Sequence, residues 1–131
     1  MSSIVAVLDS SAMLCLLHRE PGMDKVAGHI AGGHVAMSAV NYCEVMGKLI
    51  DLNKDIGKAA REMQQLDIQL MTFDEQQALS AAELRRTTRN LGLSLGDRSF
   101  LALANHPKAV AVTADSAWKA VEPYCRVDLI R

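Results

Sequence analysis

A short apolar run that ends in a carboxylate constrains the fold of this chain more than any other feature. Residues 4–8 read Ile-Val-Ala-Val-Leu, and Asp9 follows directly. A run this short and rich in β-branched residues is typical of a strand buried on both faces, as in a parallel sheet. Ser10 and Ser11 then open a helix-forming stretch over residues 12–17. Asp9 therefore lies at the sheet edge where open α/β folds bind ligands, although a simple helix cap also explains it.

The rest of the chain repeats this alternation of strand and helix. Further strands are predicted over residues 34–37, 68–73, 109–113 and 126–130, and helices over 23–30, 39–50, 56–63, 74–91, 97–104 and around Trp118. Strands that alternate with helices throughout predict a parallel sheet between two helical layers. We therefore expect one three-layer α/β/α domain over residues 1–131, with a five-stranded parallel sheet.

Composition excludes several classes of protein. The chain has 131 residues, half of them hydrophobic, and a net charge of −1, which argues against nucleic-acid binding through bulk positive charge. The sequence predicts neither a membrane span nor a signal peptide, so a cytoplasmic location is expected. Cys15, Cys43 and Cys125 lack metal-ligand spacing and are odd in number, so they are expected to be reduced, buried thiols.

Four acidic residues are predicted to lie at the carboxyl edge of the sheet. Asp9 follows the first strand and Asp115 the fourth, while Asp97 begins the helix that leads into the fourth strand. Glu44 lies in the second turn of the helix after the second strand. Helix capping explains each aspartate separately, and pairing with Lys48 on the same helix explains Glu44. Capping alone does not explain why carboxylates recur along a single edge.

Carboxylates that converge repel one another unless a hard divalent cation lies among them. Mg²⁺ and Mn²⁺ prefer oxygen ligands, and carboxylate clusters that hold one or two such ions hydrolyse phosphodiester bonds. A phospho-receiver needs paired acids on the first strand and a lysine late in the chain, and an aspartyl phosphatase needs an Asp-x-Asp motif after that strand. Both fit poorly, because Ser10 and Ser11 follow Asp9. A module that binds RNA or protein without cleaving it remains an alternative, although an acidic edge disfavours RNA binding electrostatically.

Four segments together resemble the motifs of PIN-domain ribonucleases. Their order and spacing, and the chain length, resemble the VapC toxins of toxin–antitoxin pairs. The segments are residues 8–12 (Leu-Asp-Ser-Ser-Ala), residues 38–45, residues 93–98 with 101–104, and residues 113–115 with Trp118.

The resemblance implies a Mg²⁺-dependent endoribonuclease, with Mn²⁺ as a substitute ion, that forms a homodimer and is inhibited by a small cognate antitoxin. Gly96, where the family often has alanine, is a departure expected to loosen the approach to Asp97. Carried over to this sequence, the metal ligands are Asp9 and Asp97, the acidic pocket is completed by Glu44 and Asp115, and the supporting polar groups are Ser10, Asn41 and Thr113.

Basic residues that could hold RNA lie mainly in one predicted helix. Because aromatic residues make up only 4% of the chain, base stacking is not expected to dominate, and phosphate contacts and RNA shape should matter more. A solvated helix face is the competing explanation for this basic group. The candidates are Arg85, Arg86, Arg89 and Arg98.

Overall fold

The computed structural model describes residues 4–105, 109–121 and 126–131, and it contains the predicted five-stranded parallel sheet. The strand order is β3-β2-β1-β4-β5, so β1 lies at the centre with β2 and β4 on its two sides. Leu8 pairs with Val112, which brings Asp9 beside Thr113 at the carboxyl end of the sheet. The strands are β1 (Ala6–Leu8), β2 (Val35–Ser38), β3 (Ile68–Met71), β4 (Val110–Thr113) and β5 (Arg126–Leu129).

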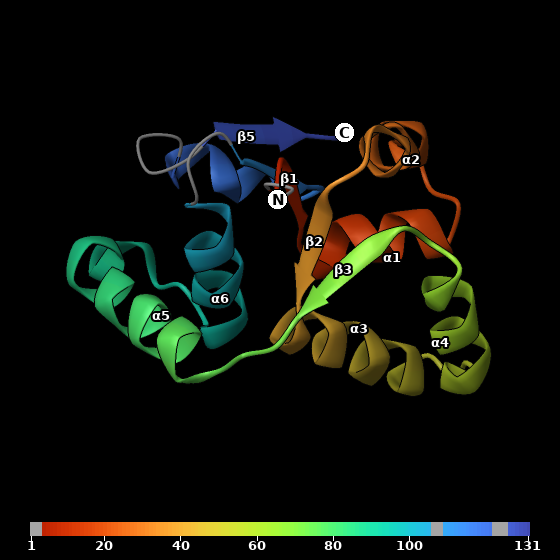
Figure 1. The fold of residues 1–131 in the computed structure, drawn as a ribbon, viewed down its shortest axis with the longest axis horizontal. Coiled ribbons are helices and arrows are strands. Elements are labelled where there is room, and N and C mark those ends of the chain that lie inside the picture. Colours follow the sequence, from red (N-terminus) through yellow and green to blue (C-terminus); the bar gives the residue numbers. More distant parts are fainter. Residues whose placement is uncertain (1–3, 106–108, 122–125) are drawn as a thin grey trace.

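Helices cover both faces of this sheet, which confirms the three-layer prediction (Figure 1). Helices α1 to α4 contribute to the core on one face, and α5, α6 and η2 pack on the other. Among the described residues, no helix is long and apolar enough to cross a membrane. The helices are α1 (Ser10–Leu17), α2 (Met23–Gly32), α3 (Ala39–Asp51), α4 (Ile56–Gln64), α5 (Glu75–Thr88) and α6 (Leu95–Ala104), with short 3-10 helices η1 (Arg89–Leu91) and η2 (Ser116–Val121).

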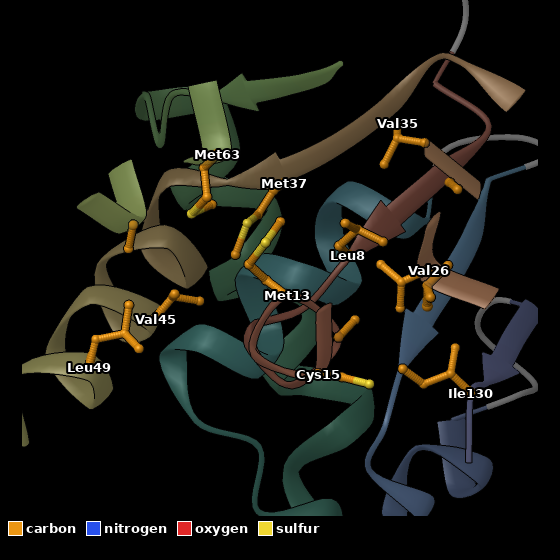
Figure 2. Close-up of a cluster of buried hydrophobic side chains, with 14 residues drawn as sticks. Leu8, Met13, Cys15, Val26, Val35, Met37, Val45, Leu49, Met63 and Ile130 are labelled. Carbon is orange, nitrogen blue, oxygen red and sulfur yellow. The ribbon is translucent and has the colours of Figure 1, made fainter. Parts of the chain in front are cut away.

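Alternation along β1 explains why its sequence is apolar without interruption. Leu8 belongs to the buried cluster that also contains Met13 and Met37 (Figure 2). Val7 faces the opposite cluster, where the Phe100 and Trp118 rings meet edge to face with centroids 5.0 Å apart. Successive side chains of a strand point to opposite faces, so both faces of β1 must be apolar when helices cover both.

The start of α6 differs from the sequence prediction. The helix begins at Leu95, two residues before Asp97, which was predicted to be its first residue. The reason is Ser94, whose hydroxyl accepts a hydrogen bond from the Asp97 N–H at 3.1 Å, while the Asp97 carboxylate accepts one from the Ser94 N–H at 3.0 Å. This reciprocal capping box fixes the first turn, because serine is a strong N-cap residue. Asp97 is therefore in the first turn and not at the cap.

Other element ends also fall short of their predicted positions, β3 and α5 among them. β3 ends at Met71 and does not continue to Phe73. The α-helical part of α5 ends at Thr88, where the threonine hydroxyl donates to the Leu84 carbonyl at 2.7 Å, and η1 then carries the chain to the predicted end at Leu91. A hydroxyl that bonds back to the preceding turn bends a helix, which accounts for the change to 3-10 geometry here.

The cysteines only partly follow the prediction of buried thiols. Cys15 is buried, and its Sγ contacts the Pro21 carbonyl at 3.3 Å. Cys43 is exposed, which corrects the prediction. The buried face of α3 carries Val45, and a residue two positions away points to the opposite side of a helix. Cys125 lies outside the described residues.

Candidate metal centre at the carboxyl edge of the sheet

Asp9 is a buried carboxylate with hydrogen-bond donors on both oxygens. Its side chain is only 6% exposed, and Thr113 Oγ1 donates to Oδ2 at 2.6 Å. Oδ1 accepts from the Ser11 hydroxyl at 2.7 Å and from the Ala12 N–H at 2.8 Å, so Asp9 also caps α1. A carboxylate offers about four lone-pair positions, and three are used here. Room therefore remains for one further ligand.

The pKa of Asp9 is raised above its ordinary value of 3.8. The largest cause is burial, which disfavours the charged form. Hydrogen bonds from Thr113, Ser11 and the Ala12 N–H oppose the rise, and the nearby charge of Asp115 adds to it. A cation bound beside Asp9 would stabilise the charged form that burial disfavours.

Thr113 connects the two aspartates at the ends of the central strands. Thr113 is completely buried. Its hydroxyl group donates a hydrogen bond to Asp9, and the same oxygen accepts one from the Asp115 N–H at 3.0 Å. The Asp115 carboxylate is exposed and accepts from the Ala117 N–H at 3.0 Å, which caps the start of η2 as predicted. Asp9, Thr113 and the exposed Asp115 are called the buried half of the acidic edge below, after the burial of Asp9 and Thr113.

Glu44 and Asp97, with Asn41, form the open half of the acidic edge. Asn41 Nδ2 donates to Glu44 Oε1 at 2.8 Å and to the Gly96 carbonyl at 3.2 Å, so it ties α3 to the first turn of α6. Asn41, which was predicted to be a supporting polar group, is only 2% exposed. The reason is that α6 packs on α3 over this position. Glu44 itself is exposed, and its carboxylate accepts a hydrogen bond from Asn41. Pairing with Lys48 was the structural explanation that the sequence offered for Glu44.

A cavity of about 490 Å³ has one carboxylate of each half in its lining. Asp97 of the open half and Asp115 of the buried half both line it, together with Trp118 and the turn around Gly92. Gly92 has a φ of 64°, a left-handed conformation that glycine adopts without strain, and this lets the chain turn back sharply before α6. The cavity therefore opens between η1, α6 and η2 at the edge where the carboxylates were predicted to lie.

The donor set suits a hard divalent cation bound through few direct contacts. Within the described residues, no group of three or more His, Cys, Asp or Glu side chains is close enough to enclose a metal ion. Mg²⁺ keeps several of its waters and is commonly held by one or two carboxylates, so it does not need such an enclosure. The groups that face this edge are oxygen donors, which Mg²⁺ and Mn²⁺ prefer.

A family model of the PIN domain matches residues 6–122. The chain belongs to the PIN-domain family. None of the curated proteins matched it. Its fold is shared with a chain of VapBC2 from Rickettsia felis bound to a promoter DNA fragment, at a TM-score of 0.72, 15% identity, and coverage of 94% of this chain and 96% of that one.

Two further solved structures have the same fold. DNA-bound VapBC from Salmonella typhimurium matches at a TM-score of 0.70 and 16% identity, with 98% of both chains covered. FitAcB from Neisseria gonorrhoeae matches at 0.63 and 20% identity, with 93% of this chain and 95% of that chain covered. At these identities, the likeness establishes the shared fold.

The predicted RNA-binding arginines occupy different settings in this PIN domain. Arg85 and Arg89 are exposed along α5 and η1. Arg86 is exposed too, but its Nε lies 2.6 Å from Glu83 Oε1. Arg98 Nη1 donates to the Ala81 carbonyl at 3.2 Å, so this guanidinium helps pack α6 against α5. A role for Arg98 in RNA binding stays a prediction.

Two serines of the PIN-domain edge were missed by sequence reasoning. Ser10 was singled out, but the hydroxyl that contacts Asp9 belongs to Ser11, which also accepts from the Ala114 N–H at 2.9 Å. When two serines are adjacent at the start of a helix, the sequence does not show which of the two hydroxyls contacts the aspartate. Ser94 lies outside the helix predicted to begin at Asp97, although its spacing of three residues from Asp97 fits a capping box and is the signal that identifies it.

Proposed function

We propose that this PIN domain is a Mg²⁺-dependent endoribonuclease and the toxin of a toxin–antitoxin pair. The observation that carries the proposal is the acidic edge. There, Asp97 and Asp115 line one cavity, Glu44 shares the Asn41 amide with the first turn of α6, and Asp9 accepts a hydrogen bond from Thr113. The solved structures with this fold include toxin–antitoxin complexes, which supports the biological setting.

Asp9 and Asp97 are the proposed metal ligands. Glu44 and Asp115 complete the negative charge of the pocket. A divalent ion, when bound, supplies positive charge for a phosphodiester oxygen and favours ionisation of the attacking water. Thr113 and Ser11 orient the Asp9 carboxylate, while the capping box holds Asp97 in the first turn of α6. The same oxygen ligands accept Mn²⁺ as a substitute ion.

The RNA backbone is proposed to lie along the exposed arginines beside the cavity. Arg85 and Arg89 are exposed and belong to the segment that leads to Gly92, which lines the cavity. Guanidinium groups bind phosphate oxygens in a two-pronged geometry. The acidic edge would then repel the RNA backbone except where a metal ion neutralises it.

The direct test is to incubate the protein with total RNA in Mg²⁺ or in EDTA and to map new 5′ ends. Discrete ends that form only in Mg²⁺ are expected. The matched control is Asp55→Asn, because Asp55 caps α4 through the Gly57 and Lys58 N–H groups and contacts none of the site residues. Binding of RNA with no new ends would instead favour the non-cleaving binding module.

A small antitoxin is proposed to block the acidic edge with a cation. An arginine pairs with two carboxylate oxygens and could lie against Asp97 and Asp115 in their shared cavity. Replacing each basic residue in the toxin-binding segment of the antitoxin should therefore weaken the complex. Unchanged affinity after all of these replacements would exclude this mode of inhibition. The proposed homodimer is checked by sedimentation of the free protein.

A further inference from the structure

Gly96, in the first turn of α6, lies directly beneath the carboxylate of Glu44. A Cβ added at position 96 would lie 2.6 Å from Glu44 Oε1. Favourable contacts between heavy atoms require roughly 3.5–4.0 Å, so the carboxylate occupies the space that any side chain at this position would fill. The expected loosening around Asp97 is not what the glycine provides; it makes room for Glu44.

Backbone geometry does not require a glycine at this position. Gly96 is inside α6, and it is absent from the residues of positive φ, which include Gly22, Gly33 and Gly92. Alanine is a better helix former than glycine, so helix stability alone would favour alanine at position 96. The missing side chain is explained by the neighbouring carboxylate.

Asn41 holds the same carboxylate from the side. Its Nδ2 donates both to Glu44 Oε1 and to the Gly96 carbonyl, at 2.8 and 3.2 Å. The Asn41 side chain is only 2% exposed, and within the described part of the chain its Oδ1 has no partner. A buried amide whose oxygen has no partner is a costly way to satisfy an exposed glutamate unless the position of that glutamate matters.

We propose that Gly96 and Asn41 are positioning residues that fix the Glu44 carboxylate against the first turn of α6, next in sequence to Asp97. This inference rests on the proposed metal-dependent nuclease function and deepens it. Glu44 would be held in place before any ion arrives, so no reorientation is needed on binding. Groups that orient metal-site carboxylates in this way commonly change metal affinity or activity by 10–100-fold when removed.

The test compares Gly96→Ala with Gly28→Ala. Gly28 lies within α2, and a Cβ added there meets nothing within 4 Å, so it controls for the change in helix propensity. In Gly96→Ala only, the side-chain amide signals of Asn41 in ¹H–¹⁵N spectra should shift, because Glu44 is displaced. The Mg²⁺ affinity measured by calorimetry without RNA should fall by ~10–100-fold. Both variants should remain folded, because the flexible end of Glu44 can move away.

A second pair of variants shows whether the effect passes through Glu44. Gly96→Ala should have no further effect on Mg²⁺ affinity when it is added to Glu44→Ala, since the displaced group is then absent. Unchanged Asn41 amide signals in Gly96→Ala, or an equal loss of affinity in the Glu44→Ala background, would overturn the inference. The RNA cleavage assay judges the proposed function separately, because the spectra and the calorimetry require no substrate.

Discussion

The two halves of the acidic edge stabilise their carboxylates in different ways. In the buried half, adjacent strands β1 and β4 bring Asp9 and Thr113 side by side, and three donors surround a charge that is 6% exposed. In the open half, helices α3 and α6 carry Glu44 and Asp97, which are held by Asn41 and by a capping box. Sheet register builds the first half, and helix packing builds the second.

This difference shows what each half needs in order to hold its carboxylates in place. Burial is the largest influence on Asp9 and raises its pKa, so the buried half needs its hydrogen bonds to keep the carboxylate charged. The carboxylate of Glu44 is exposed to water, and its contact with Asn41 fixes its position. The buried half therefore depends on hydrogen-bond donors to Asp9, and the open half depends on the space at Gly96 and on the hydrogen bond from Asn41 to Glu44.

The largest expected effect comes from removing one ligand in each half. Asp9→Asn and Asp97→Asn should each lower RNA cleavage by at least ~10²-fold, because an amide keeps the shape but loses the charge that binds the ion. Since both residues would act on the same ion, the double variant should lose little more than the worse single variant. Initial cleavage rates at saturating Mg²⁺ measure this. A wild-type cleavage rate in Asp97→Asn would show that the open half is not part of the metal site.

Thr113→Val should destabilise the protein more than Ser94→Ala. The valine leaves Asp9 Oδ2 buried without its donor, which costs about 1–3 kcal/mol. Loss of the Ser94 cap in the open half costs about 1 kcal/mol, because water can reach the exposed N–H. Urea unfolding of both variants without metal gives the two values. Equal losses would mean that burial does not distinguish the halves.

The smallest expected effect is a stabilisation by Asp9→Asn in EDTA. Because the folded pKa of Asp9 lies above 3.8, its charged form costs stability at neutral pH. Removing the charge should stabilise the metal-free protein at pH 7 by ~0.5–2 kcal/mol. The gain should fade as the pH falls through the folded pKa of Asp9 toward 3.8, since wild-type Asp9 then becomes neutral as well. Thermal unfolding across this pH range measures the difference, and a pH-independent gain would assign it to another cause.

Local patterns in the sequence were enough to predict the fold and much of the acidic edge. The apolar run before Asp9 predicts a central strand because both of its faces must be buried, and the structure confirms this. Hydroxyl and carboxylate residues at strand ends, such as Thr113 and Asp115, indicate the carboxyl edge in the same way. The roles proposed for these residues in metal binding stay predictions.

Contacts between distant helices could not be predicted from the sequence. The burial of Asn41 is one example, because nothing in its own helix shows that α6 packs over it. The space at Gly96 depends on a side chain 52 positions earlier, and no local pattern encodes that contact. The raised pKa of Asp9 is a further example, because it arises more from burial by the surrounding elements than from the neighbouring charge of Asp115.

The central position of β1 in the strand order has a consequence for local unfolding of the protein. Amide hydrogens exchange with solvent most readily where a segment can detach without disrupting the rest. β3 and β5 are the edge strands and can fray, whereas β1 is paired on both sides by β2 and β4. The Val7 and Val112 amides should therefore exchange only when the whole domain unfolds. Asp9 would stay in place during every smaller opening, including those that free an edge strand.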